Sequence, residues 1–224
     1  MSFKQQGLPQ DWPALAGWLA AQGHALETDP APRQFAGGLA NLNYRVLLDG
    51  APAVFRRPPG GELAHGASDM AREAKVLTGL NRCFPLAPGL IAFCDDRSVL
   101  GVPFQILEFR PGAAIGGELP TGFTVADAGW LLDALSGAMA ALHAIDPAAA
   151  GLADLGKPTG FAERQLRGWT KRAAAAFAEE APPQLAALLA RMEAGLPPDP
   201  PAGLLHMDPK FDNLLVDAET RSAT

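Results

Sequence analysis

The 224-residue sequence is poor in cysteine and in positive charge. Its two cysteines, Cys83 and Cys94, fit no metal-ligand spacing and are too few for a disulfide framework, so reduced thiols in a cytoplasmic protein are the simpler interpretation. The net charge of −6 argues against nucleic acid or an anionic membrane as the main partner. The first residues lack the apolar core of a signal peptide, and no apolar run approaches the ~18 residues that a membrane helix needs.

What the sequence does contain is typical of a globular protein. Apolar residues make up 48% of the chain and charged residues 19%, which argues against disorder. The length suits one large domain or two small lobes. Because the chain as a whole is acidic, any phosphate-binding site has to be local, built from a few arginines, lysines and backbone N–H groups.

The sequence pattern changes near the middle of the chain. The first half alternates as short strands, with one early helix capped by Asp11, a second capped by Ser68 or Asp69, and a tight reversal at Asp49-Gly50. From residue 111 onward the pattern is helical. The expected helices cover 11–23, 68–82, 124–143, 161–178 and 184–194. The expected strands lie within 35–48, 53–57, 89–94 and 103–109, with a turn at 95–98.

This order predicts an α+β fold in two lobes. A helical extension would cover residues 1–33, a lobe of sheet and helix 34–110, and a second, mostly helical lobe 111–224. The clearest helix of the second lobe, 124–143, begins with a shortened capping box of Thr124 and Asp127. Its apolar positions form a continuous stripe: Val125, Ala128, Leu131, Leu132, Leu135, Met139 and Leu142.

The most informative stretch is the polar run His206–Asn213, which apolar dipeptides flank on both sides. Four residues separate Asp208 from Asn213. That is the spacing of the phosphoryl-transfer loop in which an Asp accepts the proton of a substrate hydroxyl and an Asn holds Mg²⁺. A surface turn rich in Asp, Pro and Asn has the same composition. The motif alone leaves both interpretations open.

Three features of the first half bear on this choice. Gly37-Gly38 lies between two strands, where backbone N–H groups can approach a phosphate, although most such turns bind nothing. Glu73 interrupts the apolar stripe of the helix predicted over 68–82, and a buried carboxylate needs a partner. Arg56, on the preceding strand, is the natural partner. The alternative is a solvated Glu73 at the edge of the stripe.

These features follow one another along the chain, and together they match the parts that phosphoryl transfer uses: a glycine turn, a cation on the next strand, a helix carboxylate and Asp-x4-Asn. From about residue 34 to its end the chain resembles the aminoglycoside phosphotransferase/choline kinase-like family, a small-molecule branch of the protein-kinase-like fold. Within it, the chain is most similar to bacterial phosphotransferases that resemble the kinase domain fused to acyl-CoA dehydrogenases in animals. The segments that carry this resemblance are 37–44, 54–60, 72–73, 98–104, 107–109, 142–146, 165–169 and 206–213.

The resemblance implies a two-lobed protein-kinase-like fold, with an antiparallel sheet plus helix in the N-lobe and an incomplete, mostly helical C-lobe. It also implies that ATP or GTP is the phosphoryl donor. A loop would cover the nucleotide phosphates, a cation on a strand would pair with a carboxylate on a helix, and a hinge segment would meet the nucleotide base. The residues that it assigns to the nucleotide are Gly37, Gly38, Asn41, Arg56, Glu73, Glu108, Phe109 and Arg110. Arg56 would take the place of the kinase strand lysine, with Arg57 as a rival if the register differs by one residue.

In the second lobe the resemblance implies a catalytic loop. Asp208 would orient and deprotonate the hydroxyl of a small-molecule acceptor, Lys210 would neutralise the transferred phosphoryl group, and Asn213 would bind Mg²⁺. The family carries a further metal-binding Asp after the Asn, whereas Asp217 looks like a turn residue. We therefore expect a chain truncated at its C-terminus, and the alternative function is a nucleotide-binding, pseudokinase-like module without transfer activity.

Two further alternatives are weaker. A hydrolase that uses His206 and Asp208 would need a nucleophile, and the sequence has no Gly-x-Ser-x-Gly or reactive-cysteine signature. A metal site of His206, Asp208 and Asp212 lacks further ligands nearby. Met207 stands where many members of the resembled family have Gly or Arg, which looks tolerable. Nothing in the sequence indicates an oligomeric state.

Overall fold

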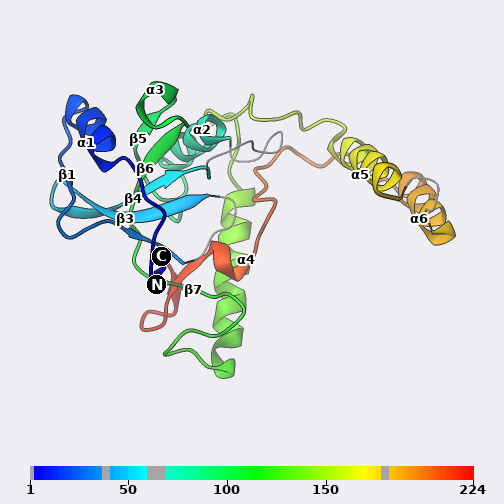
Figure 1. The fold of residues 1–224 in the computed structure, drawn as a ribbon. Coiled ribbons are helices and arrows are strands. Elements are labelled where there is room, and N and C mark those ends of the chain that lie inside the picture. The colour runs from blue at the N-terminus through cyan, green and yellow to red at the C-terminus, as the bar shows by residue number, and fades with distance from the viewer. Residues whose placement is uncertain (1–2, 37–40, 60–68, 178–181) are drawn as a thin grey trace. The chain divides into compact units, whose positions relative to one another are not determined.

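The computed structural model describes residues 3–36, 41–59, 69–177 and 182–224 (Figure 1). The chain divides into two compact units. The first consists of Met1–Ile145 with Leu205–Thr224, and the second is Asp146–Leu204. The lobe boundaries predicted from the sequence divide the chain in a different way, and they stay predictions.

An antiparallel sheet dominates the first unit, with strand order β1-β3-β4-β6-β5 and β2 paired to β3. Its strands are β1 (Leu26–Glu27), β2 (Arg33–Gln34), β3 (Leu42–Leu48), β4 (Ala51–Arg57), β5 (Leu90–Cys94) and β6 (Phe104–Glu108). Asp49 and Gly50 join β3 to β4 with φ values of 52° and 78°. Two successive positive φ angles make the tight hairpin turn that an Asp-Gly pair favours, so the predicted reversal is confirmed.

Helix α1 (Trp12–Ala21) packs on one face of this sheet. Its first turn is capped by Asp11, whose Oδ1 accepts a hydrogen bond of 2.9 Å from the N–H of Ala14, as predicted. The fully buried Leu15 and Leu19 lie in one core with apolar side chains of the sheet: Tyr44, Val46, Leu48, Ala53, Phe55, Cys94, Phe104 and Ile106. The early helix is therefore part of the packing that holds the sheet.

Helix α2 (Met70–Leu80) packs against β5 and β6 and is drawn on the other side of them from α1 (Figure 1). Of the two predicted caps, Asp69 is the one observed, because its Oδ1 accepts from the N–H of Arg72 at 2.9 Å. The segment predicted as a turn at 95–98 instead begins a short helix, α3 (Arg97–Leu100). Asp96 caps it by accepting from the N–H of Ser98 at 2.8 Å.

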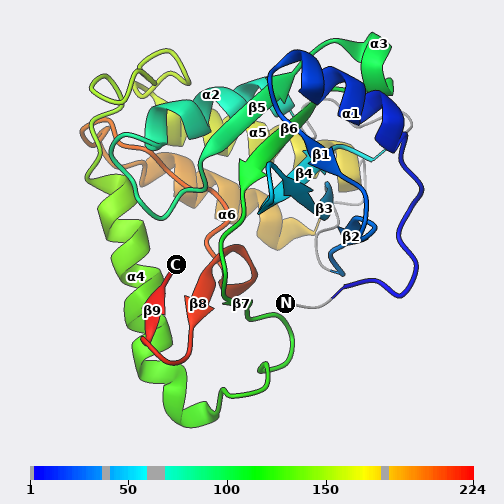
Figure 2. The same ribbon diagram turned by 90° about the vertical axis from the view of Figure 1, so that its left-hand side faces the viewer.

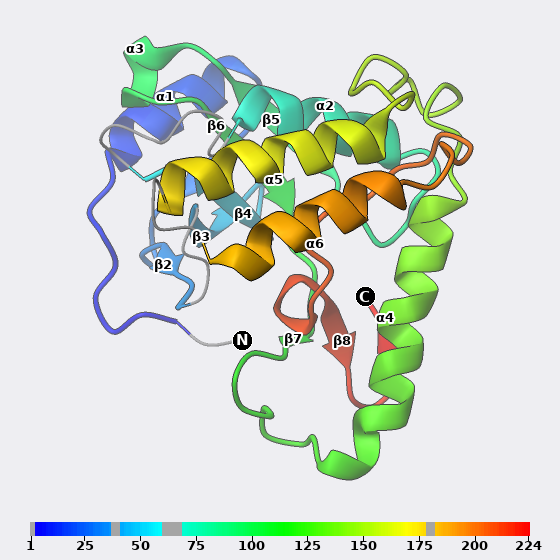
Figure 3. The same ribbon diagram turned by 90° about the vertical axis from the view of Figure 1, so that its right-hand side faces the viewer.

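The rest of the first unit is a small sheet beside a long helix (Figures 2 and 3). A 3₁₀ turn, Val125–Asp127, leads into α4 (Ala128–His143). The strands are β7 (Ala113–Ala114), β8 (Leu215–Asp217) and β9 (Ser222–Ala223), paired in the order β7-β8-β9. Their common core contains Ile115, Leu131, Ala138, Leu214 and Val216. The predicted capping box is present, since Asp127 accepts from the N–H of Thr124 at 2.7 Å.

The continuous apolar stripe predicted for this helix is wrong in part. Leu131 and Leu142 are buried, but Val125 is 83% exposed and Leu132 is 58% exposed. The small sheet covers one side of α4, so only a narrow part of the apolar surface is removed from water. By length and composition alone, Val125–His143 is apolar enough to cross a membrane, contrary to the expectation that no run approaches that length. One such helix is weak evidence for a span, and Asp127 and Asp133 lie along it.

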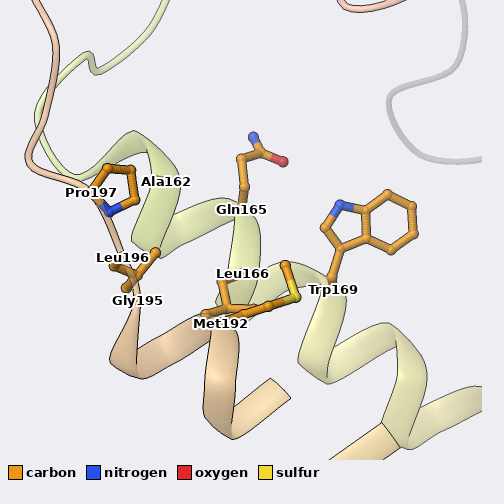
Figure 4. A pocket seen from close by; sticks show the side chains of 8 residues that line it. All are labelled: Ala162, Gln165, Leu166, Trp169, Met192, Gly195, Leu196 and Pro197. Carbon is orange, nitrogen blue, oxygen red and sulfur yellow. The ribbon is translucent and has the colours of Figure 1, made fainter. Parts of the chain in front are cut away.

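The second unit contains two helices that run side by side, α5 (Phe161–Phe177) and α6 (Pro183–Ala194) (Figure 3). They agree with the helices predicted over 161–178 and 184–194. A cavity of about 360 Å³ opens between them (Figure 4). Its lining is mostly apolar: Ala162, Gln165, Leu166, Trp169, Met192, Gly195, Leu196 and Pro197.

Candidate active site

A row of polar side chains crosses the main sheet of the first unit. Asn43 on β3 pairs with Arg56 on β4, and Arg56 pairs with Gln105 on β6. Residues that are directly opposite in neighbouring strands project on the same face. The register therefore places an amide, a guanidinium and a second amide next to one another on one face of the sheet. On this face Glu73, from α2, contacts both Arg56 and Gln105.

Arg56 and Glu73 form the ion pair predicted from the sequence. The Arg56 Nε lies 2.7 Å from Glu73 Oε1, and Arg56 Nη2 donates to Glu73 Oε2 at 3.3 Å. Arg56 Nη1 also donates to the Oδ1 of Asn43 at 3.1 Å. Glu73 is thus paired and not simply solvated at the edge of its helix.

The rival cation, Arg57, takes a different direction because successive residues of a strand point to opposite faces. Its Nη1 donates to Gln10 Oε1 at 2.9 Å, and its Nε donates to the carbonyl of Pro58 at 3.2 Å. Burial lowers the pKa of Arg57, although the nearby Tyr44 works in the opposite direction. The register of β4 thus makes Arg56, and not Arg57, the partner of Glu73.

Gln105 is a member of the row that sequence reasoning missed. Its side chain is fully buried, and its Nε2 donates to Glu73 Oε1 at 2.7 Å. The only sign of it in the sequence is one amide among the apolar residues of the strand predicted over 103–109. Which of those residues would meet the helix carboxylate depends on the register between strands.

In the predicted hinge, Glu108–Arg110, the side chains of Glu108 and Arg110 bond to the neighbouring segment 87–89 and to each other. Glu108 Oε2 accepts from the N–H of Gly89 at 2.9 Å and lies 3.0 Å from Arg110 Nη2, which also donates to the carbonyl of Ala87 at 3.3 Å. The guanidinium of Arg45 lies 5.3 Å from the centre of the Phe109 ring. The Glu108 and Arg110 side chains thus hold this segment against residues 87–89, and a nucleotide-binding role of the hinge stays a prediction.

The predicted phosphate loop is described only at its end. Gly37 and Gly38 lie outside the described residues. Asn41 is buried and lies directly before β3. Its assignment to the nucleotide therefore stays a prediction.

The predicted catalytic loop is a closed local structure. Asn213 Nδ2 donates at 2.9 Å both to the carbonyl oxygen and to the Oδ2 of Asp208. Asn213 ends a 3₁₀ turn, Phe211–Asn213, which lies directly before the buried Leu214. Met207, just before the Asp, has a φ of 68°, in the left-handed region that favours glycine. The turn anchors one end of the loop to the core, and the amide ties its two ends together.

Charge gathers on the same loop. Lys210 Nζ lies 3.1 Å from Asp208 Oδ2 and 3.8 Å from Asp212 Oδ2. The hydrogen bond from Lys210, followed by that from Asn213, lowers the pKa of Asp208. The same contact with Asp208, with the charges of Asp208 and Asp212, raises the pKa of Lys210. Both groups are therefore ionised at neutral pH.

Potential metal ligands are few in the part of the chain that the structure describes. There, no cluster of three or more His, Cys, Asp or Glu residues could hold a metal ion. Asp217 behaves as the turn residue predicted, because its Oδ1 accepts from the N–H groups of Glu219 and Thr220 at 2.8 and 3.4 Å. Since Asn213 directs its Nδ2 to Asp208, the Oδ1 of Asn213 is the atom that could meet a cation.

Comparison with known proteins now decides the family. The model of the phosphotransferase enzyme family matches residues 32–223. The chain belongs to this family. The resemblance inferred from the sequence motifs is thereby confirmed.

Curated relatives include acyl-CoA dehydrogenase family member 10 of Mus musculus, which is 28% identical over 217 residues. Acyl-CoA dehydrogenase family member 11 of Homo sapiens is 29% identical over 186 residues. These alignments cover 96% and 81% of this chain but only 20% and 23% of the relatives. The chain thus spans about a fifth of the length of these relatives.

Solved structures agree on the fold. A putative aminoglycoside phosphotransferase from Ralstonia eutropha superposes with a TM-score of 0.77 at 27% identity, covering 96% of this chain and 63% of that one. A macrolide 2′-phosphotransferase from Brachybacterium faecium gives 0.62 at 23% identity, covering 94% of this chain and 69% of that one. The predicted α+β, kinase-like fold is therefore confirmed.

Proposed function

We propose that the chain carries the donor-binding and catalytic-loop part of an ATP- or GTP-dependent phosphotransferase that acts on a hydroxyl group of a small molecule. The observation that carries this proposal is the loop in which Asn213 closes onto an ionised Asp208, with Lys210 at the same carboxylate. The first unit also contains the Arg56–Glu73 ion pair. Membership of the phosphotransferase enzyme family supports the same reaction class.

Two neighbours support a nucleotide donor. An aminoglycoside phosphotransferase solved with GDP and kanamycin, and an aminoglycoside 2′-phosphotransferase solved with GDP, share the fold at 21% and 16% identity. Arg56, held by Glu73, would neutralise the nucleotide phosphates. The segment Glu108–Arg110 would meet the base. Gly37-Gly38 would cover the phosphates from the loop outside the described residues.

Asp208 is suited to orient an acceptor hydroxyl. Lys210 and Asn213 both contact its Oδ2, so Oδ1 is the oxygen that an incoming hydroxyl would meet. A carboxylate with a lowered pKa accepts a hydrogen bond well but takes up a proton less readily, which favours an orienting role early in the reaction. Lys210 would neutralise charge on the transferred phosphoryl group.

Mg²⁺ fits the oxygen chemistry of this loop. Asn213 Oδ1 is a hard oxygen donor of the kind that Mg²⁺ prefers. When bound with the nucleotide, the ion would neutralise the phosphate oxygens. The acceptor is proposed only as a small molecule with an alcohol group, in a cytoplasmic setting that the two free thiols suit.

The test combines nucleotide binding with phosphate transfer in the purified chain. Asp208→Ala is expected to lower transfer by about 10²–10⁴-fold while leaving nucleotide affinity within about twofold of wild type. Asp133→Asn, on α4 and outside the proposed site, serves as the matched control. Equal transfer rates in wild type and Asp208→Ala would refute the role of Asp208.

A second candidate is a nucleotide-binding module without transfer. It is favoured by the lack of an acidic metal cluster among the described residues and by the use of Asp217 in a turn. Binding of ATP or GTP without transfer to any hydroxylated acceptor, in a chain whose folding is verified, would favour this candidate over the phosphotransferase.

A further inference from the structure

Gln105 is the buried polar residue of β6. Its neighbours Phe104 and Ile106 are fully buried, and so is Gln105 itself. Burying an amide costs free energy unless hydrogen bonds compensate for the lost water. An apolar side chain would pack at this position at lower cost, so the amide needs a reason in the structure.

The hydrogen bond from Gln105 to Glu73 explains why an amide is present at this position. Gln105 Nε2 donates to Glu73 Oε1 at 2.7 Å, and the same oxygen lies 2.7 Å from Arg56 Nε. The carboxylate on α2 is therefore held from two neighbouring strands, β6 and β4. The Oε1 of Gln105 is buried and has no hydrogen-bond partner among the described residues. Turning the amide over would put this oxygen against the carboxylate, so the contact with Glu73 fixes its orientation.

The row continues on the far side of Arg56. Asn43 Oδ1 accepts from Arg56 Nη1 at 3.1 Å, while Glu73 meets Nε and Nη2 of the same guanidinium. A guanidinium is planar, so contacts at two of its edges define its plane. Asn43 sets one edge directly. Gln105 acts on the other edge through the carboxylate that it holds.

We propose that Gln105 is a positioning residue, which fixes the carboxylate of Glu73 and through it the guanidinium of Arg56. Its consequence for nucleotide binding rests on the proposed function, in which Arg56 meets the nucleotide phosphates. Without the amide, the carboxylate would be free to take other rotamers, and the guanidinium would lose its fixed plane.

The pH profile of Gln105→Glu tests this role. Within the described part of the chain, the charged groups that face position 105 are Glu73 on α2 and Arg56 across the β4–β6 pairing. From β5, the uncharged Phe93 pairs with it. Two carboxyl groups this close share a proton up to a higher pH than an isolated one. While the proton is held, the new carboxylic acid donates to Glu73 as the amide does. Once it is lost, two carboxylates repel each other and compete for Arg56.

The measurement is the affinity for ATP with Mg²⁺ between about pH 5.5 and pH 8.5, given relative to wild type at each pH so that titration of the nucleotide cancels. Gln105→Glu is expected to bind nearly as wild type at the low end and about tenfold more weakly at the high end, which corresponds to about one pKa unit of differential interaction. Gln105→Met has a similar volume and cannot donate, so it is expected to bind about threefold to tenfold more weakly at every pH.

A matched control is Gln34→Glu, which also introduces a carboxyl group at a buried glutamine of the same sheet, 4% exposed and bonded to Leu8 and Tyr44. Its relative affinity is expected to stay flat with pH, and melting temperatures at each pH verify folding of every variant. If wild type binds no nucleotide, the proposed function fails and the consequence for binding fails with it. If wild type binds, and both Gln105 variants bind like wild type at every pH, the positioning role alone is refuted.

Discussion

The Arg56–Glu73 ion pair lends itself to a double-mutant cycle, with Arg56→Met, Glu73→Gln and the two changes combined. Two unit charges about 4 Å apart interact by about 4 kcal/mol at an effective dielectric constant of about 20. The two side chains keep 27% and 29% of their surface exposed, so solvent screening and lost side-chain entropy reduce this value. We expect a coupling of about 2 kcal/mol, between the values typical of exposed pairs and of buried ones.

The assay is urea unfolding of wild type, the two single variants and the double variant. Arg56→Met is expected to cost about 2–3 kcal/mol, because it leaves the Glu73 carboxylate with Gln105 as its donor. The coupling energy is the difference between the effect of the double variant and the sum of the single ones.

Arg57 offers a matched control one residue further along β4. Its guanidinium donates to Gln10 and Pro58, so Arg57→Met is expected to combine additively with Glu73→Gln, within about 0.5 kcal/mol. A coupling below about 0.5 kcal/mol between Arg56 and Glu73, or an equal one between Arg57 and Glu73, would contradict the assignment of the pair.

Further predictions concern the loop and the small sheet. The contact with Lys210 lowers the pKa of the Asp208 carboxyl. The stability that this contact contributes is therefore present above the ordinary carboxyl pKa and is lost as pH falls through the lowered pKa of the folded state. Lys210→Met should move the NMR titration of Asp208 to higher pH, and an unchanged midpoint would contradict the contact. Gly112 has a φ of 137°, and a Cβ there would lie 3.0 Å from Thr224 Oγ1 and 3.2 Å from the Val216 carbonyl oxygen, so Gly112→Ala should cost about 1–3 kcal/mol by urea unfolding. Gly129→Ala, in the open on α4, is the control and should be neutral or stabilise by up to about 1 kcal/mol. Met207 has a φ of 68° and an exposed side chain. Met207→Ile should lower the stability by about 1 kcal/mol, whereas Met207→Asn should not, because Asn tolerates the left-handed region. Equal melting temperatures of the two variants would argue against a left-handed conformation at this position.

Some features of this protein depend only on residues close together in the chain, and these were predictable. The hairpin turn at Asp49-Gly50 follows from two residues that tolerate positive φ. The caps by Asp11 and Asp127 join side chains to N–H groups three residues away. The loop contact between Asp208 and Asn213 spans five residues. In each case the local backbone geometry brings donor and acceptor together, whatever the rest of the fold does.

The exposed face of α4 shows where local pattern fails. The apolar positions of the helix were visible, but Leu132 is exposed while its neighbour Leu131 is buried. A hydrophobic stripe in the sequence indicates which side chains of a helix are suited to burial. How wide a part of it is covered depends on the elements that pack against the helix, here the small sheet β7-β8-β9.

The row of polar side chains across the main sheet, Asn43, Arg56 and Gln105, shows the same limit of local sequence patterns at the proposed site. From the sequence alone, Arg56 and Arg57 both remained candidates, and Gln105 was only one amide in an apolar strand. The register of β3, β4 and β6 puts Asn43, Arg56 and Gln105 on one face, and the docking of α2 brings Glu73 to them. A shift of one residue would turn every one of these strand side chains to the opposite face. The sequence by itself therefore determined the hairpin turn at Asp49-Gly50, the caps by Asp11 and Asp127, and the close spacing of Asp208 and Asn213. Only the tertiary structure decided which side chains hold one another across the sheet, because that depends on strand register and helix docking.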